Sequence, residues 1–144
     1  MKIAFDAQLF LGGDKTGIAW NAHNLLKELL KYTEHEYVLQ CMKGRRATGQ
    51  LHQFLEYQKA GCTVEYCSRC SYTLYKLLWI FIPVPHRFFF RTKADISQFF
   101  NYAVPPGASG KRVTFIYDMA YKACPWKKKK KTRIWLKLCM KKTC

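Results

Sequence analysis

Acidic side chains are scarce in this sequence. Only 9 Asp and Glu stand against 25 Lys and Arg, which gives the chain of 144 residues a formal net charge of +16 at pH 7. The excess is concentrated near the end, because residues 111–144 carry 12 basic residues and a single acid. This imbalance implies anionic partners, such as phosphates, acidic lipid headgroups or nucleic acid.

Long hydrophobic runs are absent as well. The most apolar stretch, residues 77–84, is far shorter than the ~18–20 residues that a membrane-spanning helix needs. Only three apolar residues separate Lys2 from Asp6, so no signal-peptide core forms. Without an export signal, an odd count of 7 cysteines indicates reduced thiols and not a disulfide framework. We therefore expect a cytoplasmic protein that can lie against a membrane surface.

The patterns that mark metal sites and nucleophilic enzymes are incomplete. Cys67 and Cys70 have C-x-x-C spacing with Cys62 upstream, but a zinc site needs a second pair and none follows. None of the 4 histidines has an acid or a nucleophile at a suggestive spacing. The lysine run 127–131 attracts phosphate without specificity, and no nucleic-acid recognition module accompanies it. We expect no metal, and nucleic-acid binding is the weaker interpretation of the charge.

What is present is the composition of a folded domain, with 49% hydrophobic and 16% aromatic residues. Short apolar runs alternate with segments of helical periodicity. The runs predict strands at residues 3–5, 37–42, 63–66, 94–100 and 112–117, and the periodic segments predict helices at 18–31, 50–60, 71–83 and 127–143. This alternation predicts an α/β fold, a Rossmann-like and mostly parallel sheet with helices on both faces.

The first 31 residues carry the strongest indication of a binding site. A strand that ends at Asp6 is followed by a loop with Gly12, Gly13 and Gly17, and then by an amphipathic helix. Glycines let the backbone approach a ligand, and free N–H groups at a helix start attract anions such as a diphosphate. The spacing is neither G-x-G-x-x-G nor a P-loop, so on spacing alone a flexible surface turn is the favoured interpretation and a phosphate-binding loop is the alternative.

Asp118 follows the fifth expected strand as Asp6 follows the first. In a parallel sheet both would emerge at the carboxyl edge, where ligands of open α/β sheets bind. An aspartate at a strand end can also merely cap the next turn. Two of them beside a glycine loop favour a site at this edge.

Residues 71–93 combine helical spacing with many aromatic side chains. Those singled out are Trp79, Phe81, Phe88, Phe89 and Phe90, which lie among Lys76, Arg87, Arg91 and Lys93. Core aromatics with solvated basic tips are the favoured interpretation, and a membrane-surface segment is the alternative.

The order of these segments is similar to that of a known family. The opening MKIAFDAQLF with GGDKTGIAWNAHNLLKELL resembles the start of the family-4 retaining glycosyltransferases, where a strand ending in Asp-Ala precedes a glycine loop and a long helix. The stretch ADISQFFNYAVPPGASGKRVTFIYDMAY resembles a later segment of that family, and PWKKKKKTRIWLKLCMKKTC is similar to the helix after it. The likeness runs nearly from end to end of the chain.

The resemblance implies a GT-B architecture of two Rossmann-like domains, of which residues 1–144 would be a truncated N-terminal, acceptor-side domain without the donor domain. Gly12, Gly13 and Gly17 would then border the donor diphosphate, with Asp6 and the pair Tyr117 and Asp118 at the cleft edge. Tyr117 stands where the family commonly has histidine. A tyrosine is a poorer proton shuttle near neutral pH, so we assign it no catalytic part.

The implied reaction transfers a sugar from a nucleotide sugar to a glycan or lipid-linked acceptor, without a metal or other cofactor. Residues 1–144 alone are expected to be inactive, because the groups that stabilise the departing diphosphate are not encoded. Peripheral contact with an anionic membrane would bring the enzyme to its acceptor. The rivals are a small basic nucleic-acid-binding protein and a non-catalytic remnant.

Overall fold

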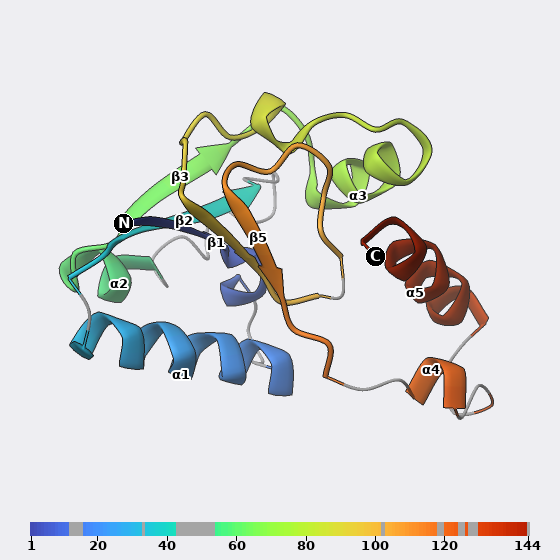
Figure 1. The fold of residues 1–144 in the computed structure, drawn as a ribbon, viewed down its shortest axis with the longest axis horizontal. Helices are drawn as coiled ribbons and strands as arrows, with labels where there is room; N and C mark the ends of the chain where they lie inside the picture. Colours follow the sequence, from blue (N-terminus) through green and yellow to red (C-terminus); the bar gives the residue numbers. More distant parts are fainter. Residues whose placement is uncertain are drawn as a thin grey trace.

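The computed structural model describes residues 1–11, 16–32, 34–42, 54–101, 103–117, 120–123, 126 and 130–143. Its centre is a sheet of five strands, all parallel, in the order β3-β2-β1-β4-β5 (Figure 1). The strands are β1 (Lys2–Asp6), β2 (Glu36–Met42), β3 (Thr63–Cys67), β4 (Ile96–Phe99) and β5 (Lys111–Thr114). This arrangement confirms the Rossmann-like α/β fold that the alternation of segments predicts.

Helices surround the sheet. They are η1 (Ala7–Phe10), α1 (Gly17–Tyr32), α2 (Leu55–Lys59), α3 (Tyr72–Phe81), η3 (His86–Phe88), α4 (Ala120–Ala123) and α5 (Lys130–Thr143). The helix expected at residues 50–60 is described only from residue 54, and the first residues of the one expected at 127–143 lie outside the described part. No helix in the described part of the chain is long and apolar enough to cross a bilayer.

The strand order places β1 between the two halves of the sheet. The chain builds outward from β1 to β2 and β3, and then returns so that β4 pairs with the other side of β1. The order therefore reverses at the β1–β4 boundary, and a crevice forms at the carboxyl ends of strands on either side of such a boundary.

One face of the sheet packs against α1 and α2. The start of α1 is capped by Thr16, whose Oγ1 accepts a hydrogen bond from the Ala19 N–H at 3.3 Å. Ala22 and Leu26 of α1 are fully buried in a core cluster that includes Phe5 and Leu39 of the sheet. Because side chains alternate along a strand, the residues between these point to the opposite face.

The opposite face packs against the segment after α3, and its carboxyl end packs against α3 and α5. Its core includes Met42 of β2, Tyr75 and Trp79 of α3, and Phe90. Helix α3 is capped by Ser71, whose Oγ accepts from the Leu74 N–H at 3.2 Å. Both α3 and α5 lie beyond the carboxyl ends of the strands, so they close over that edge of the sheet (Figure 1).

Strand β5 ends earlier than expected, at Thr114 and not at residue 117. Its register with β4 runs from Ile96 opposite Lys111 to Phe99 opposite Thr114, and β4 itself ends at Phe99. Beyond Thr114, Phe115 leaves the ladder and stacks on Phe100 with ring centroids 5.8 Å apart. The chain after β5 is thereby directed over the carboxyl edge.

Candidate functional site

A cavity of about 500 Å³ lies at the carboxyl edge of the sheet, within the size range of small-molecule sites. Its lining comes from the ends of β1, β2 and β4, the start of α1, the segment after β5, and helices α3 and α5. We call it the carboxyl-edge cavity. It occupies the place where the reversal of strand order predicts a ligand crevice.

Asp6, the last residue of β1, lines this cavity. Its Oδ1 accepts a hydrogen bond from the Gln8 N–H at 3.3 Å, which caps η1. Burial raises the pKa of Asp6 to about 6, while the Gln8 N–H and the charge of Lys76 act in the opposite direction. Such a carboxyl exchanges protons close to neutral pH, which suits a proton acceptor or donor in a binding site.

Lys76 of α3 also lines the cavity and brings a positive charge toward Asp6. Its Nζ lies 4.6 Å from the ring centroid of Tyr72 and 5.2 Å from that of Trp135, in cation–π geometry. Among the described residues, no carboxylate lies within ion-pair distance of this ammonium. It is therefore placed to bind an anionic group that enters the cavity, such as a phosphate.

Two tyrosines of α3 add hydroxyl groups to the lining. Burial, followed by the nearby charge of Asp6, raises the pKa of Tyr72 and of Tyr75 well above the ordinary value, and a hydrogen bond between Tyr72 and Asn101 partly offsets this. Both hydroxyls stay neutral at physiological pH. They can donate and accept hydrogen bonds but cannot act as charged bases.

Gln40 lies beside Asp6 in the sheet, as its register partner on β2. Its Nε2 donates to Oε2 of Glu65 at 2.9 Å, and Oε1 of Glu65 accepts from the N–H groups of Arg91 and Thr92 at 2.6 and 3.2 Å. Burial raises the pKa of Glu65, but these hydrogen bonds outweigh it and hold the pKa below the ordinary value. Glu65 thus fastens the segment before β4 to the sheet and fixes that side of the cavity.

His86 lines the same cavity from η3 and is buried against aromatic rings. Its ring centroid lies 4.8 Å from that of Phe90 and 5.7 Å from that of Phe99. Burial lowers the pKa of His86 to about 4, with a smaller opposing effect from Glu65. The imidazole is therefore neutral at pH 7 and contributes shape and hydrogen-bonding atoms, not charge.

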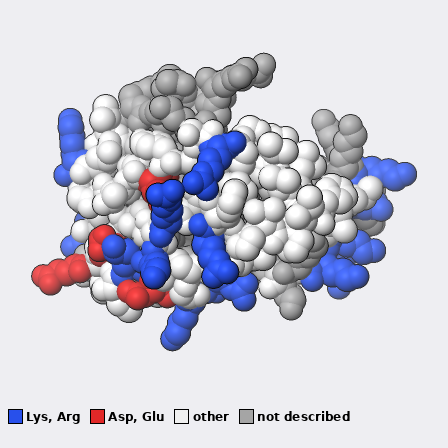
Figure 2. Space-filling model, turned by 90° about the horizontal axis from the view of Figure 1, so that it is seen from above, with Lys and Arg blue, Asp and Glu red and all other residues white. Residues whose placement is uncertain are grey.

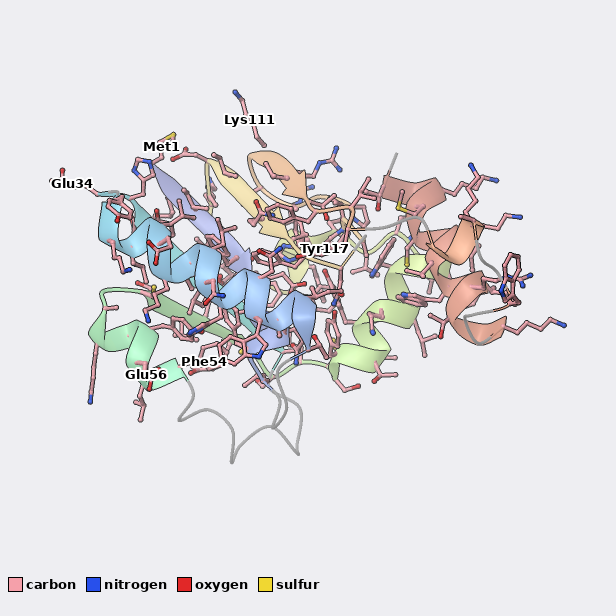
Figure 3. All side chains as sticks on the ribbon, turned by 90° about the horizontal axis from the view of Figure 1, so that it is seen from below. Met1, Glu34, Phe54, Glu56, Lys111 and Tyr117 are labelled. Atoms are coloured by element: carbon pink, nitrogen blue, oxygen red, sulfur yellow. The ribbon has the colours of Figure 1, made fainter. Side chains whose placement is uncertain are left out.

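Three of the six residues that the sequence indicates for a site line this cavity: Asp6, Gly17 and Tyr117. Figure 3 shows Tyr117 between the strand ends and the helices that close over them. Gly12, Gly13 and Asp118 lie outside the described residues. At Gly17 a Cβ would meet no atom within 4 Å, so the protein itself does not require glycine there.

Eight further polar residues line the cavity that the sequence did not indicate for this site. They are Gln8, Gln40, Tyr72, Tyr75, Lys76, His86, Asn101 and Thr132. For Lys76 there was a usable signal, since it is the only charged residue in the strongly apolar segment of α3. For Gln40 and His86 there was none, because their positions depend on strand register and on the path of the chain after α3.

The described cysteines are isolated or buried thiols. In the described part of the chain, no three His, Cys, Asp or Glu residues gather closely enough to hold a metal ion. Cys67 is buried and Cys70 half-buried, and burial raises the pKa of Cys70, whereas a reactive thiol needs a lowered pKa. Comparison of the chain with protein-family models, with curated proteins and with solved structures finds no match.

Proposed function

We propose that this chain is the acceptor-side half of a glycosyltransferase and that it binds a sugar in the carboxyl-edge cavity. Together with a donor domain it would transfer a sugar from a nucleotide sugar to a glycan or lipid-linked acceptor, at the cytoplasmic side of a membrane. The resemblance of residues 1–31 and 94–121 to family-4 glycosyltransferases supports this class of enzyme. The observation that carries the proposal is Asp6, a carboxyl whose pKa is raised to about 6 inside a cavity at the switch point of the sheet.

The chemistry of the lining suits a sugar that carries or approaches a phosphate. The carboxylate of Asp6 accepts a hydrogen bond from a sugar hydroxyl and orients it for attack. The neutral hydroxyls of Tyr72 and Tyr75 supply further hydrogen bonds, and Trp79 adds an apolar part to the lining. Lys76 neutralises a phosphate oxygen of either the donor or a phosphorylated acceptor.

Residues 1–144 alone are expected to show no transferase activity. In this proposal the departing nucleotide diphosphate is stabilised by a second domain, and electrostatic stabilisation of the leaving charge is a large part of such catalysis. Incubating the chain with nucleotide sugars and following nucleotide release measures this directly. Robust turnover by this polypeptide would contradict the half-enzyme proposal.

Binding can be tested without turnover. A titration of the ¹⁵N-labelled chain with nucleoside diphosphates, nucleotide sugars and small oligosaccharides should give saturable shifts at the amides of Asp6, Gly17 and α3. Asp6→Asn should weaken binding of a neutral sugar at least about tenfold, which is the effect of losing one charged hydrogen bond. Glu34→Gln, an exposed carboxylate in the connection between α1 and β2, is the matched control and should change nothing. Saturable binding that Asp6→Asn leaves unchanged would contradict the role of the cavity, as would the absence of any binding.

A further inference from the structure

Helix α3 is apolar on both sides. On its inner side Tyr75 and Trp79 are buried against the sheet and α5. On its outer side Leu74 and Leu77 are each 47% exposed and Phe81 is 78% exposed. An amphipathic helix on the surface of a water-soluble protein carries polar residues on the side that faces water. The exposed apolar side chains on the outer side of α3 are therefore expected to contact an apolar or amphiphilic partner.

The exposed apolar row continues into the segment that follows α3. Ile82 is 56% exposed and Phe88 is 58% exposed. Phe88 is held beside the beginning of α3, because Nη1 of Arg69 donates to its carbonyl oxygen at 2.6 Å and the guanidinium lies 5.1 Å from its ring centroid. We call these five side chains, Leu74, Leu77, Phe81, Ile82 and Phe88, the α3 surface.

The charged residues in the stretch of chain that carries the α3 surface have one sign. No acidic residue occurs between Glu65 and Asp95, while five basic residues do: Arg69, Lys76, Arg87, Arg91 and Lys93, of which Lys76 faces the carboxyl-edge cavity. Arg87, Arg91 and Lys93 are exposed. Figure 2 looks onto this side of the sheet and shows an uncharged expanse with Lys and Arg on either side, while the acidic side chains gather toward one end.

The combination of exposed apolar side chains and basic residues distinguishes between two candidate partners, a second copy of the chain and a lipid bilayer. We call the exposed Arg87, Arg91 and Lys93 the basic rim. A second copy of the chain would place the same basic rim opposite itself in a two-fold interface, and like charges repel. An anionic bilayer offers negative headgroups to the rim and acyl chains to the apolar row, which is the pattern that interfacial helices use. The charge complementarity favours the bilayer.

We propose that the α3 surface docks this chain onto an anionic lipid bilayer, with Phe81, Ile82 and Phe88 entering the headgroup boundary and Arg87 and Arg91 contacting lipid phosphates. Tyr75 and Trp79 of the same helix line the carboxyl-edge cavity on its other side. The cavity would then lie about one helix diameter, ~10 Å, from the lipid surface. At this distance a lipid-linked acceptor can reach the cavity from the bilayer. Access of the acceptor depends on the proposed function, whereas docking to the bilayer does not.

The test is co-sedimentation of the full chain with vesicles of phosphatidylcholine, with and without phosphatidylglycerol, at low and high salt. Binding should require phosphatidylglycerol and weaken with salt. Phe81→Ser with Ile82→Ser should weaken binding at least about tenfold. The matched control is Tyr32→Ser with Leu55→Ser, which removes side chains that are 80% and 53% exposed on α1 and α2, and it should bind like the unaltered chain.

Three results would overturn the docking proposal. Equal binding by the two double variants would mean that the net charge alone attracts the lipid. Equal binding to vesicles with and without phosphatidylglycerol would mean that the basic rim does not contribute to membrane binding. Light scattering that shows a dimer without lipid, lost only in Phe81→Ser with Ile82→Ser, would assign the α3 surface to a second copy. Since the ligand titration of the cavity is carried out without lipid, failure of docking and failure of the proposed function are separate outcomes.

Discussion

Replacing Asp6 with asparagine should stabilise the protein at neutral pH, although it removes the central carboxyl of the cavity. Burial raises the pKa of Asp6 from 3.8 to about 6 in the folded chain. Below pH 3.8 the carboxyl is protonated in both the folded and the unfolded states, so its burial has no charge-related cost. As the pH rises through 6, ionisation favours the unfolded state, by up to about 3 kcal/mol.

Asparagine keeps the other interaction of this side chain. Its amide oxygen can accept the hydrogen bond that Oδ1 of Asp6 takes from the Gln8 N–H, and Asn caps a helix about as well as Asp does. We therefore expect Asp6→Asn to raise the free energy of unfolding at pH 7 by about 1–3 kcal/mol. The two proteins should become equally stable near pH 4.

His86 acts in the opposite direction over the same pH range. Burial lowers its pKa from 6.5 to about 4, so the neutral ring is favoured in the folded chain. The resulting stability is fully present above pH 6.5 and is lost as the pH falls through about 4, by up to about 3 kcal/mol. In the unaltered chain the two effects nearly cancel between pH 4 and 6. In Asp6→Asn the contribution of His86 remains alone, so stability should rise steeply with pH.

Urea denaturation at several pH values between 4 and 7 measures this, with Glu34→Gln as the control for loss of an exposed carboxylate. The decisive quantity is the difference in free energy of unfolding between Asp6→Asn and the unaltered chain as a function of pH. A difference that does not change with pH, or a variant less stable than the unaltered chain at pH 7, would refute the assignment of a buried, costly carboxylate to Asp6.

Three further predictions follow from the same geometry. Lys76→Met should raise the pKa of Asp6 further, which NMR titration of the carboxyl measures, and should weaken nucleoside diphosphate binding at least about tenfold; a pKa that stays the same would show that the two side chains do not interact. Gly17→Ala should leave thermal stability unchanged or slightly raised, because its Cβ would meet no protein atom, yet it should weaken ligand binding if the ligand contacts the start of α1. Gly110→Ala should destabilise by about 3 kcal/mol or more, because Gly110 has φ +65° and a Cβ there would overlap the Asp95 carbonyl; unchanged urea denaturation would contradict this.

The fold was predictable because its signals are local. Apolar runs such as Ile3–Phe5 and helical spacing such as that of Ala22, Leu25 and Leu26 reflect which side of each segment is buried. Their alternation indicates parallel strands without knowledge of their order. Placing Asp6 at the carboxyl edge also needed only two facts, that it ends a strand and that the strands are parallel.

The aromatic segment shows the limit of local signals. Composition places Trp79, Phe81, Phe88, Phe89 and Phe90 together, as either core or membrane surface. The structure divides them, since Trp79, Phe89 and Phe90 are buried while Phe81 and Phe88 are exposed. The division depends on which side of α3 meets the sheet and on how the following chain crosses it.

By itself, then, the sequence determined the α/β class, the approximate position of each main strand and helix, and the strand-end location of Asp6, because these depend on residues close together in the chain. Only the tertiary structure decided that Lys76 and His86 join Asp6 in one cavity and that β5 stops at Thr114. Those outcomes depend on strand order, register and burial among segments far apart in the chain. The raised pKa of Asp6 and the lowered pKa of His86 have the same origin, since burial by distant segments produces both.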